Sequence, residues 1–101
     1  MLNSRQRAQL RGLANGISPV VMLGKDGMSE QITKQTDEVL EALELIKIKR
    51  LESCPCSARE AAEAIAFAVG ADVVQVIGGV AVLYRKSREK VPKDKRIKLV
   101  K

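Results

Sequence analysis

Two glycines separated by two residues, Gly24-Lys25-Asp26-Gly27, form the segment whose residue types point most directly to a chemical role. Glycine has no Cβ, so another molecule's backbone can approach closely, and free N–H groups at the start of a following helix attract phosphate. Lys25 adds a cation between the glycines. The segment lacks the Lys-Ser or Lys-Thr pair of a nucleotide-binding P-loop. The spacing therefore predicts either a loop that holds a nucleic-acid backbone or a tight turn between a strand and a helix.

Basic residues supply a second candidate site. The chain of 101 residues has a net charge of +6, but residues 85–101 carry nine Lys/Arg and two acids, +7, so residues 1–84 are at −1. Such a tail either binds a polyanion, displacing counterions from phosphates, or is simply solvated. Apolar and basic residues alternate from Arg96 to Lys101, which allows a short terminal strand or an extended segment along an acidic groove.

Several residue types needed for catalysis or metal binding are missing or scarce. The chain has no histidine, so it lacks the usual general base and the commonest metal ligand. Cys54 and Cys56 alone cannot complete a zinc site, and without a visible secretion signal we expect two reduced thiols. A strained disulfide or an intermolecular metal site is the alternative. We therefore predict no enzymatic activity, no metal site and no cofactor.

The chain is also poor in aromatic residues, with one Phe, one Tyr and no Trp. RNA-binding sheets and barrels that stack bases use several aromatic rings. We expect Phe67 in the core, and Tyr84 in the core with its hydroxyl at the rim or, alternatively, stacked on a base. A bound nucleic acid would be held more through phosphates than through stacked bases.

The elements that must position these residues can be read from apolar spacing and from turn and cap residues. No stretch reaches the ~18 apolar residues of a membrane span, and no signal peptide is visible, so we expect a cytoplasmic protein. The length suits a single domain. Residues 1–86 are expected to form this domain and residues 87–101 a basic tail. Three helices are predicted to follow caps at Ser4, at Ser29 and at the capping box of Ser57 and Glu60, the last helix ending at Gly70. Strands are predicted over residues 20–23, 45–51, 73–77 and 80–84, the last two joined at Gly78-Gly79.

The order of these elements is α-β-α-β-α-β-β, which predicts an α/β (α+β) domain with one mixed sheet of four strands. Two β-α-β connections should produce two parallel pairs, and the last strand should be antiparallel. Apolar residues on both sides of three strands indicate that helices shield much of both faces. Lys47 and Lys49 alternate with isoleucines, so part of one face should remain wet.

Taken together, these residues resemble the CRM domain family, in its small single-domain bacterial YhbY-type form. The resemblance covers nearly the whole chain, and departures lie at Cys54-Pro55-Cys56 and at Gly79-Val80. It is carried by Arg5-Gln6-Arg7, Leu10-Arg11, Leu13-Ala14, Pro19-Val20-Val21, the segment from Leu23 to Ser29, the segments 44–49 and 70–78, and Val82-Leu83-Tyr84-Arg85 with its basic continuation.

The resemblance implies a fold similar to the C-terminal domain of initiation factor three and a G-x-x-G loop analogous to that of KH domains. It implies a non-catalytic RNA-binding protein that associates with ribosomal RNA in precursors of the large ribosomal subunit. We expect a monomer without a small-molecule substrate. The alternative is a protein-interaction adaptor whose basic tail docks an acidic partner, with RNA binding incidental. The expected RNA-binding residues are Gly24, Lys25, Asp26, Gly27, Met28, Arg5, Arg7, Arg11, Lys47 and Lys49, with Arg85, Lys86 and the tail adding non-specific affinity.

Overall fold

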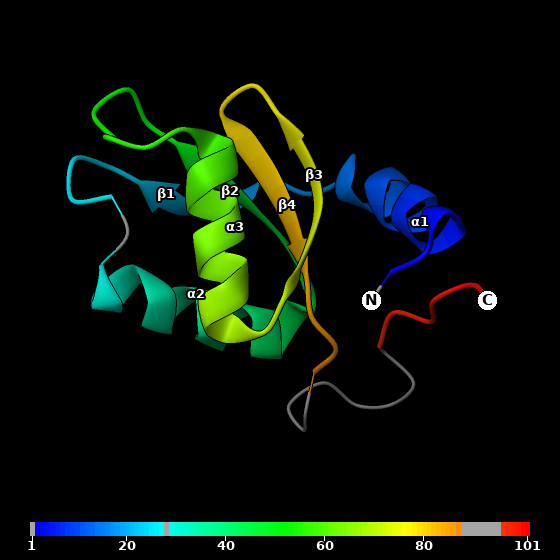
Figure 1. Cartoon of the computed structure of the whole chain (residues 1–101). Coiled ribbons are helices and arrows are strands. Elements are labelled where there is room, and N and C mark those ends of the chain that lie inside the picture. The colour runs from blue at the N-terminus through cyan, green and yellow to red at the C-terminus, as the bar shows by residue number, and fades with distance from the viewer. Residues whose placement is uncertain (1, 28, 88–95) are drawn as a thin grey trace.

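The structure is a computed structural model that describes residues 2–27, 29–87 and 96–101. These residues form three helices and four strands in the order α-β-α-β-α-β-β, which confirms the expected fold class (Figure 1). The helices are α1 (Ser4–Ala14), α2 (Glu30–Leu43) and α3 (Ala58–Val69). The strands are β1 (Pro19–Leu23), β2 (Leu45–Arg50), β3 (Asp72–Ile77) and β4 (Val80–Tyr84).

The strands form one mixed sheet in the order β1-β2-β4-β3. β1 pairs with β2 in parallel, and β4 is antiparallel to both β2 and β3. The expectation of two parallel pairs is therefore wrong for the second pair, because β4 lies between β2 and β3. The reason is the burial of β4: Ala81, Val82, Leu83 and Tyr84 are all buried, so this strand needs cover on both faces and occupies the centre.

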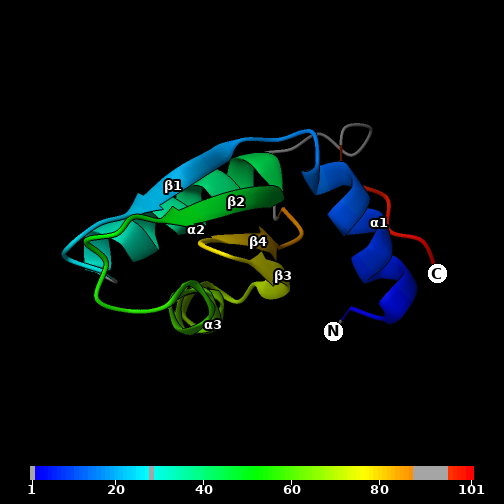
Figure 2. The same cartoon turned by 90° about the horizontal axis from the view of Figure 1, so that it is seen from above.

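The two faces of the sheet are covered unequally. α2 and α3 pack on one face, where β2 contributes Ile46 and Ile48 to the larger core. On the other face, Leu45 and Tyr84 contact a smaller core under α1, which lies apart from the other two helices (Figure 2). α1 leaves Val20 and Met22 of β1 40% and 47% exposed, so the second face is only partly shielded. We call its uncovered part the open face.

The helices begin close to the predicted residues. Ser29 caps α2, accepting from the Ile32 N–H at 3.1 Å, and the capping box of Ser57 and Glu60 at the start of α3 is confirmed. α1 instead begins one residue earlier than expected, because Asn3 is its N-cap. The Asn3 side chain accepts from the Gln6 N–H at 2.8 Å. These caps satisfy N–H groups that have no partner within the helix.

Phe67 is a clear departure from the sequence prediction: it is 91% exposed rather than in the core. α3 faces the sheet with Ala61, Ala62, Ile65 and Val69, which are all buried. Four small or branched residues let the helix approach the sheet closely, and Phe67 projects from its other side. Tyr84, by contrast, is buried as expected.

The end of the chain is fixed to the domain. Residues 96–101 form neither helix nor strand, but their backbone bonds to α1: the Gln6 amide donates to the Val100 carbonyl at 2.9 Å, and the Gln9 amide to that of Lys98 at 2.7 Å. The buried Glu44 carboxylate accepts from the Ile97 N–H at 2.9 Å. The described part of the tail is therefore an extended segment packed along α1.

Candidate nucleic-acid interface

The segment from Gly24 to Gly27 forms a turn between β1 and α2. The Gly27 N–H donates to the Gly24 carbonyl at 2.9 Å, and Lys25 and Asp26 at the tip are exposed. Gly27 itself is buried with a φ of 57°, a conformation that favours glycine. The residues that face solvent are therefore Gly24, Lys25 and Asp26, whereas Gly27 supports the turn from below. Met28, the fifth predicted residue of this loop, lies outside the described residues.

The turn rests on the segment that follows β2. A Cβ on Gly27 would lie 3.4 Å from Pro55 Cδ and 3.7 Å from Cys56 Sγ, so the two segments are in contact. The Arg50 guanidinium holds this second segment by donating to the carbonyl oxygens of Cys54, at 2.8 Å, and Cys56, at 2.5 Å. Sequence reasoning missed the contact of Pro55 with the turn, because Gly27 and Pro55 are far apart in the chain. It also missed the role of Arg50, because no cap or turn motif marks the bonds that this side chain makes.

Both cysteines of this segment are free thiols. Desolvation raises the pKa of the Cys56 thiol, and the neighbouring Cys54 raises it further. The thiolate is the form of cysteine that reacts and binds metals, so Cys56 is disfavoured in both roles. Among the described residues, no three histidine, cysteine or acidic side chains gather in a way that could hold a metal ion.

The open face carries cations from two elements. Lys47 and Lys49 alternate with the core residues of β2, so both belong to the face that α1 partly covers, and Lys49 is exposed. Arg11 in the last turn of α1 lines the same groove as Lys47. Met22 pairs with Lys49 in the sheet register, one residue before the end of β1, so this lysine lies near the glycine turn. Neither α1, β1, β2 nor β4 contains an acidic residue.

Two arginines of α1 have different surroundings. Arg5 is exposed in the first turn of the helix. Arg7 is partly buried, and its guanidinium donates to the Val73 carbonyl of β3 at 2.6 Å. Arg7 thus ties α1 to the sheet and keeps only part of its guanidinium for another ligand.

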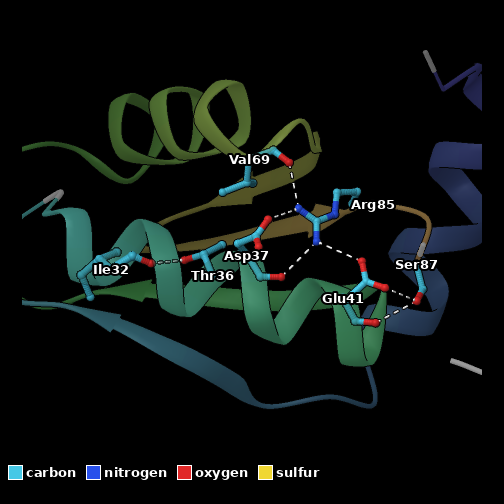
Figure 3. Close-up of polar contacts among 7 residues, drawn as sticks. All are labelled: Ile32, Thr36, Asp37, Glu41, Val69, Arg85 and Ser87. Atoms are coloured by element: carbon cyan, nitrogen blue, oxygen red, sulfur yellow. Dashed lines mark hydrogen bonds and ion pairs between the residues drawn. The ribbon is translucent and has the colours of Figure 1, made fainter. Parts of the chain in front are cut away.

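Arg85 is a correction to the predicted site, because the structure buries it at 8% exposure. Figure 3 shows its contacts with α2 and with the end of α3. Its Nη1 donates to Asp37 Oδ1 at 2.6 Å and to the Val69 carbonyl at 2.9 Å, and its Nη2 reaches the Asp37 carbonyl at 3.0 Å and Glu41 Oε1 at 3.5 Å. A guanidinium held in this way joins α2 to the end of α3 and does not face a phosphate. A run of basic residues gives no indication of which member is buried.

Lys86 is exposed, but it lies at the opposite end of the sheet from the glycine turn. It follows β4, whose last residue, Tyr84, pairs with Leu45 at the start of β2. The glycine turn instead follows Leu23, which pairs with Arg50 at the end of β2. The structure thus places Arg11 and Lys47 at one groove, Lys49 further along β2 towards the turn that carries Lys25, and Lys86 at the other end of the sheet.

The described part of the chain contains no helix that is long and apolar enough to cross a membrane.

Comparison with known proteins gives consistent results. The chain is 38% identical over 89 residues to the probable RNA-binding protein YqeI of Bacillus subtilis, covering 88% of this chain and 93% of the relative. It is 38% identical over 88 residues to an RNA-binding protein of Haemophilus influenzae, covering 87% and 89%.

The fold is also similar to a solved structure. The solution structure of the hypothetical protein SAV1595 from Staphylococcus aureus, a candidate RNA-binding protein, matches with a TM-score of 0.79 and 40% identity. The match covers 99% of this chain and all of the other. A family model, the CRS1 / YhbY (CRM) domain, matches residues 2–85. The chain therefore belongs to the CRS1/YhbY (CRM) domain family.

Proposed function

We propose that this protein is a non-catalytic RNA-binding protein of the cytoplasm that binds, as a monomer, ribosomal RNA in precursors of the large ribosomal subunit. The RNA backbone lies across the exposed part of the glycine turn, Gly24 to Asp26, and continues over the open face. Lys25, Lys49, Lys47 and Arg11 neutralise phosphates along this path. Arg5 extends the cationic surface along α1.

One observation carries the proposal: Arg11 and Lys47 line one groove of the open face, Lys49 follows on β2 towards the turn that carries Lys25, and neither α1 nor β2 contains an acidic residue. Cations on α1 and β2 with no acid on the same two elements favour a polyanion as the ligand. Gly24 has no Cβ, so the sugar–phosphate backbone of an RNA strand can approach the turn closely. The names of the relatives, which describe RNA-binding proteins, support the same ligand class.

The salt dependence of binding tests the electrostatic part of the proposal. Four phosphate contacts to single-stranded RNA give a slope of about −3 in a plot of log affinity against log salt. Affinity for a ribosomal RNA fragment should then fall about 50-fold between 50 and 200 mM salt. A flat response in fluorescence anisotropy would rule out the phosphate contacts.

Single substitutions test the location of the interface. Lys25→Ala and Lys49→Ala should each weaken binding several-fold and lower the salt slope by about one phosphate contact. Lys34→Ala is the matched control, because Lys34 is an exposed lysine of α2, on the opposite side of the sheet. If Lys34→Ala weakened binding as much as Lys25→Ala, the interface would lie elsewhere.

Sedimentation tests the ribosomal part. A tagged chain should migrate with precursors of the large subunit in a sucrose gradient, and ribonuclease treatment should release it. Association that survives ribonuclease would instead favour the adaptor function, in which a protein partner is bound directly.

A further inference from the structure

A groove lies on the open face beside the last turn of α1. It has a volume of about 260 Å³. Its floor is aliphatic and comes from Ile77, Val80 and Val82 at the β3–β4 hairpin. Its rim is polar, with Arg11 and Asn15 on the helical side and Lys47 and Gln75 on the strands.

The sheet register fixes how these groups are spaced. Val82 of β4 pairs with Lys47 of β2 on one side and with Gln75 of β3 on the other. Adjacent strands are ~4.8 Å apart, so the cation and the amide start from backbone positions about 10 Å apart, across a valine. Val82 is buried, so a flat group in the groove would lie on Val80 and on Ile77 beside it, with the cation towards one edge and the amide towards the other.

The two amides of the groove are available for a ligand. Within the described residues, the side chains of Asn15 and Gln75 make no hydrogen bond, and neither does the guanidinium of Arg11. By contrast, Gln6 and Gln9 on the same helix use their amides to hold the end of the chain. Gln75 is half-buried, so its amide is partly withdrawn from water at the groove wall.

We propose that this groove is a slot for one unpaired nucleobase of the bound RNA, with adenine preferred. The base lies with its face on Ile77 and Val80, the accessible part of the floor, and Gln75 and Asn15 bond its edge. A carboxamide presents one donor and one acceptor side by side, which matches the N6 amino group and N7 of adenine. Arg11 and Lys47 contact the flanking phosphates.

This inference rests on the proposed function and refines it. Phosphate contacts alone bind any RNA, whereas an amide at a base edge distinguishes sequences. The base slot also selects unpaired RNA, because bases in an A-form duplex are stacked and do not offer a free face to a protein side chain. An aliphatic floor takes the place of the aromatic rings that this chain lacks.

The test compares three single-stranded oligoribonucleotides of equal length, A-rich, U-rich and C-rich, with an A-U duplex, using fluorescence anisotropy and the full chain. We expect the A-rich strand to bind about 10-fold more tightly than the other two strands. Gln75→Met removes the amide at nearly constant volume and should reduce this preference to about 2-fold or less, with an unchanged salt slope. Gln35→Met, at an exposed position of α2, is the matched control and should keep the preference.

The outcomes separate the inference from the proposed function. Equal, salt-dependent binding of all strands, or a full adenine preference in Gln75→Met, would overturn the base slot and leave RNA binding intact. The duplex binding as tightly as the A-rich strand would also overturn it. Displacement of the A-rich strand by poly-glutamate of equal charge would show that the groove accepts any polyanion, again without a base. Absence of binding to every RNA would refute the proposed function itself.

Discussion

Replacement of Arg85 by methionine should destabilise the domain while leaving its RNA contacts in place. Methionine keeps most of the aliphatic volume of arginine and removes the guanidinium. In the folded protein that guanidinium bonds the side chain and carbonyl of Asp37, the Val69 carbonyl and the Glu41 carboxylate (Figure 3). The substitution therefore breaks the polar connection between α2 and α3.

The expected loss follows from the burial of each partner. A buried hydrogen bond to a charged group contributes ~1.5–3 kcal/mol, and an exposed ion pair less than ~1 kcal/mol. Asp37 is 47% exposed, which weakens its pair, whereas Val69 and Glu41 are largely shielded. The Arg85 Nε–H is buried without a hydrogen-bond partner among the described residues, so its removal offsets part of the loss. The net destabilisation should be about 3 kcal/mol, at the lower limit for breaking a buried pair.

Urea unfolding followed by circular dichroism measures this loss. With an m-value of ~1.5 kcal/mol/M, the midpoint should fall by about 2 M. Lys86→Met is the control: Lys86 is next to Arg85 in the chain but its side chain is exposed, so the free energy of unfolding should change by no more than ~0.5 kcal/mol. Equal midpoints for the two variants would refute the structural role of Arg85. An RNA affinity that dropped only in the Arg85 variant, under conditions where it remains folded, would return this arginine to the interface.

Three further predictions concern single side chains. Gly27→Ala should cost ~1–2 kcal/mol in thermal unfolding, because φ is 57° there and a Cβ would meet Pro55. Gly24→Ala, whose Cβ would lie 3.7 Å from Ser53 Oγ, should cost less than ~0.5 kcal/mol, and equal losses in the two variants would contradict the turn geometry. Burial raises the pKa of the Tyr84 hydroxyl above 10.0, and the nearby Glu44 carboxylate raises it further. The unfolded chain therefore loses this proton at a lower pH than the folded protein, so the free energy of unfolding falls as the pH rises through the folded pKa. An ultraviolet titration midpoint at or below 10.0 would contradict this. Because desolvation raises the pKa of Cys56, its alkylation should require a higher pH than that of free cysteine, and fast reaction at neutral pH would refute this.

Local residue patterns predicted most of the elements and their ends. Ser29, the pair of Ser57 and Glu60, and Gly70 act within one or two turns of their own position, so their neighbours in the chain suffice to recognise them. The same is true of the hairpin at Gly78-Gly79. The order of the strands was only partly predictable, because the central place of β4 depends on which faces the helices cover.

The candidate site divides in the same way. The glycine turn and the alternation of Lys47 and Lys49 are visible in the sequence, since both depend on spacing within a few residues. Spacing alone did not distinguish the half-buried Gly24 from the buried Gly27, or the other candidate cations from the buried Arg85. Those distinctions depend on Pro55 packing under the turn and on Asp37 reaching across from another helix.

The sequence by itself determined that this chain forms a small helix-and-strand domain with a basic end, a glycine turn and no histidine for acid–base chemistry, because composition and short-range periodicity do not depend on the final packing. Only the tertiary structure decided which cations share a surface. Arg11 and Lys47 share a groove because α1 crosses the second face of the sheet, and the pairing of β1 with β2 places Lys49 near the turn that carries Lys25. The groove between Asn15 and Gln75 arises for the same reason: 60 residues separate these amides along the chain, and only the folded sheet brings them to one rim.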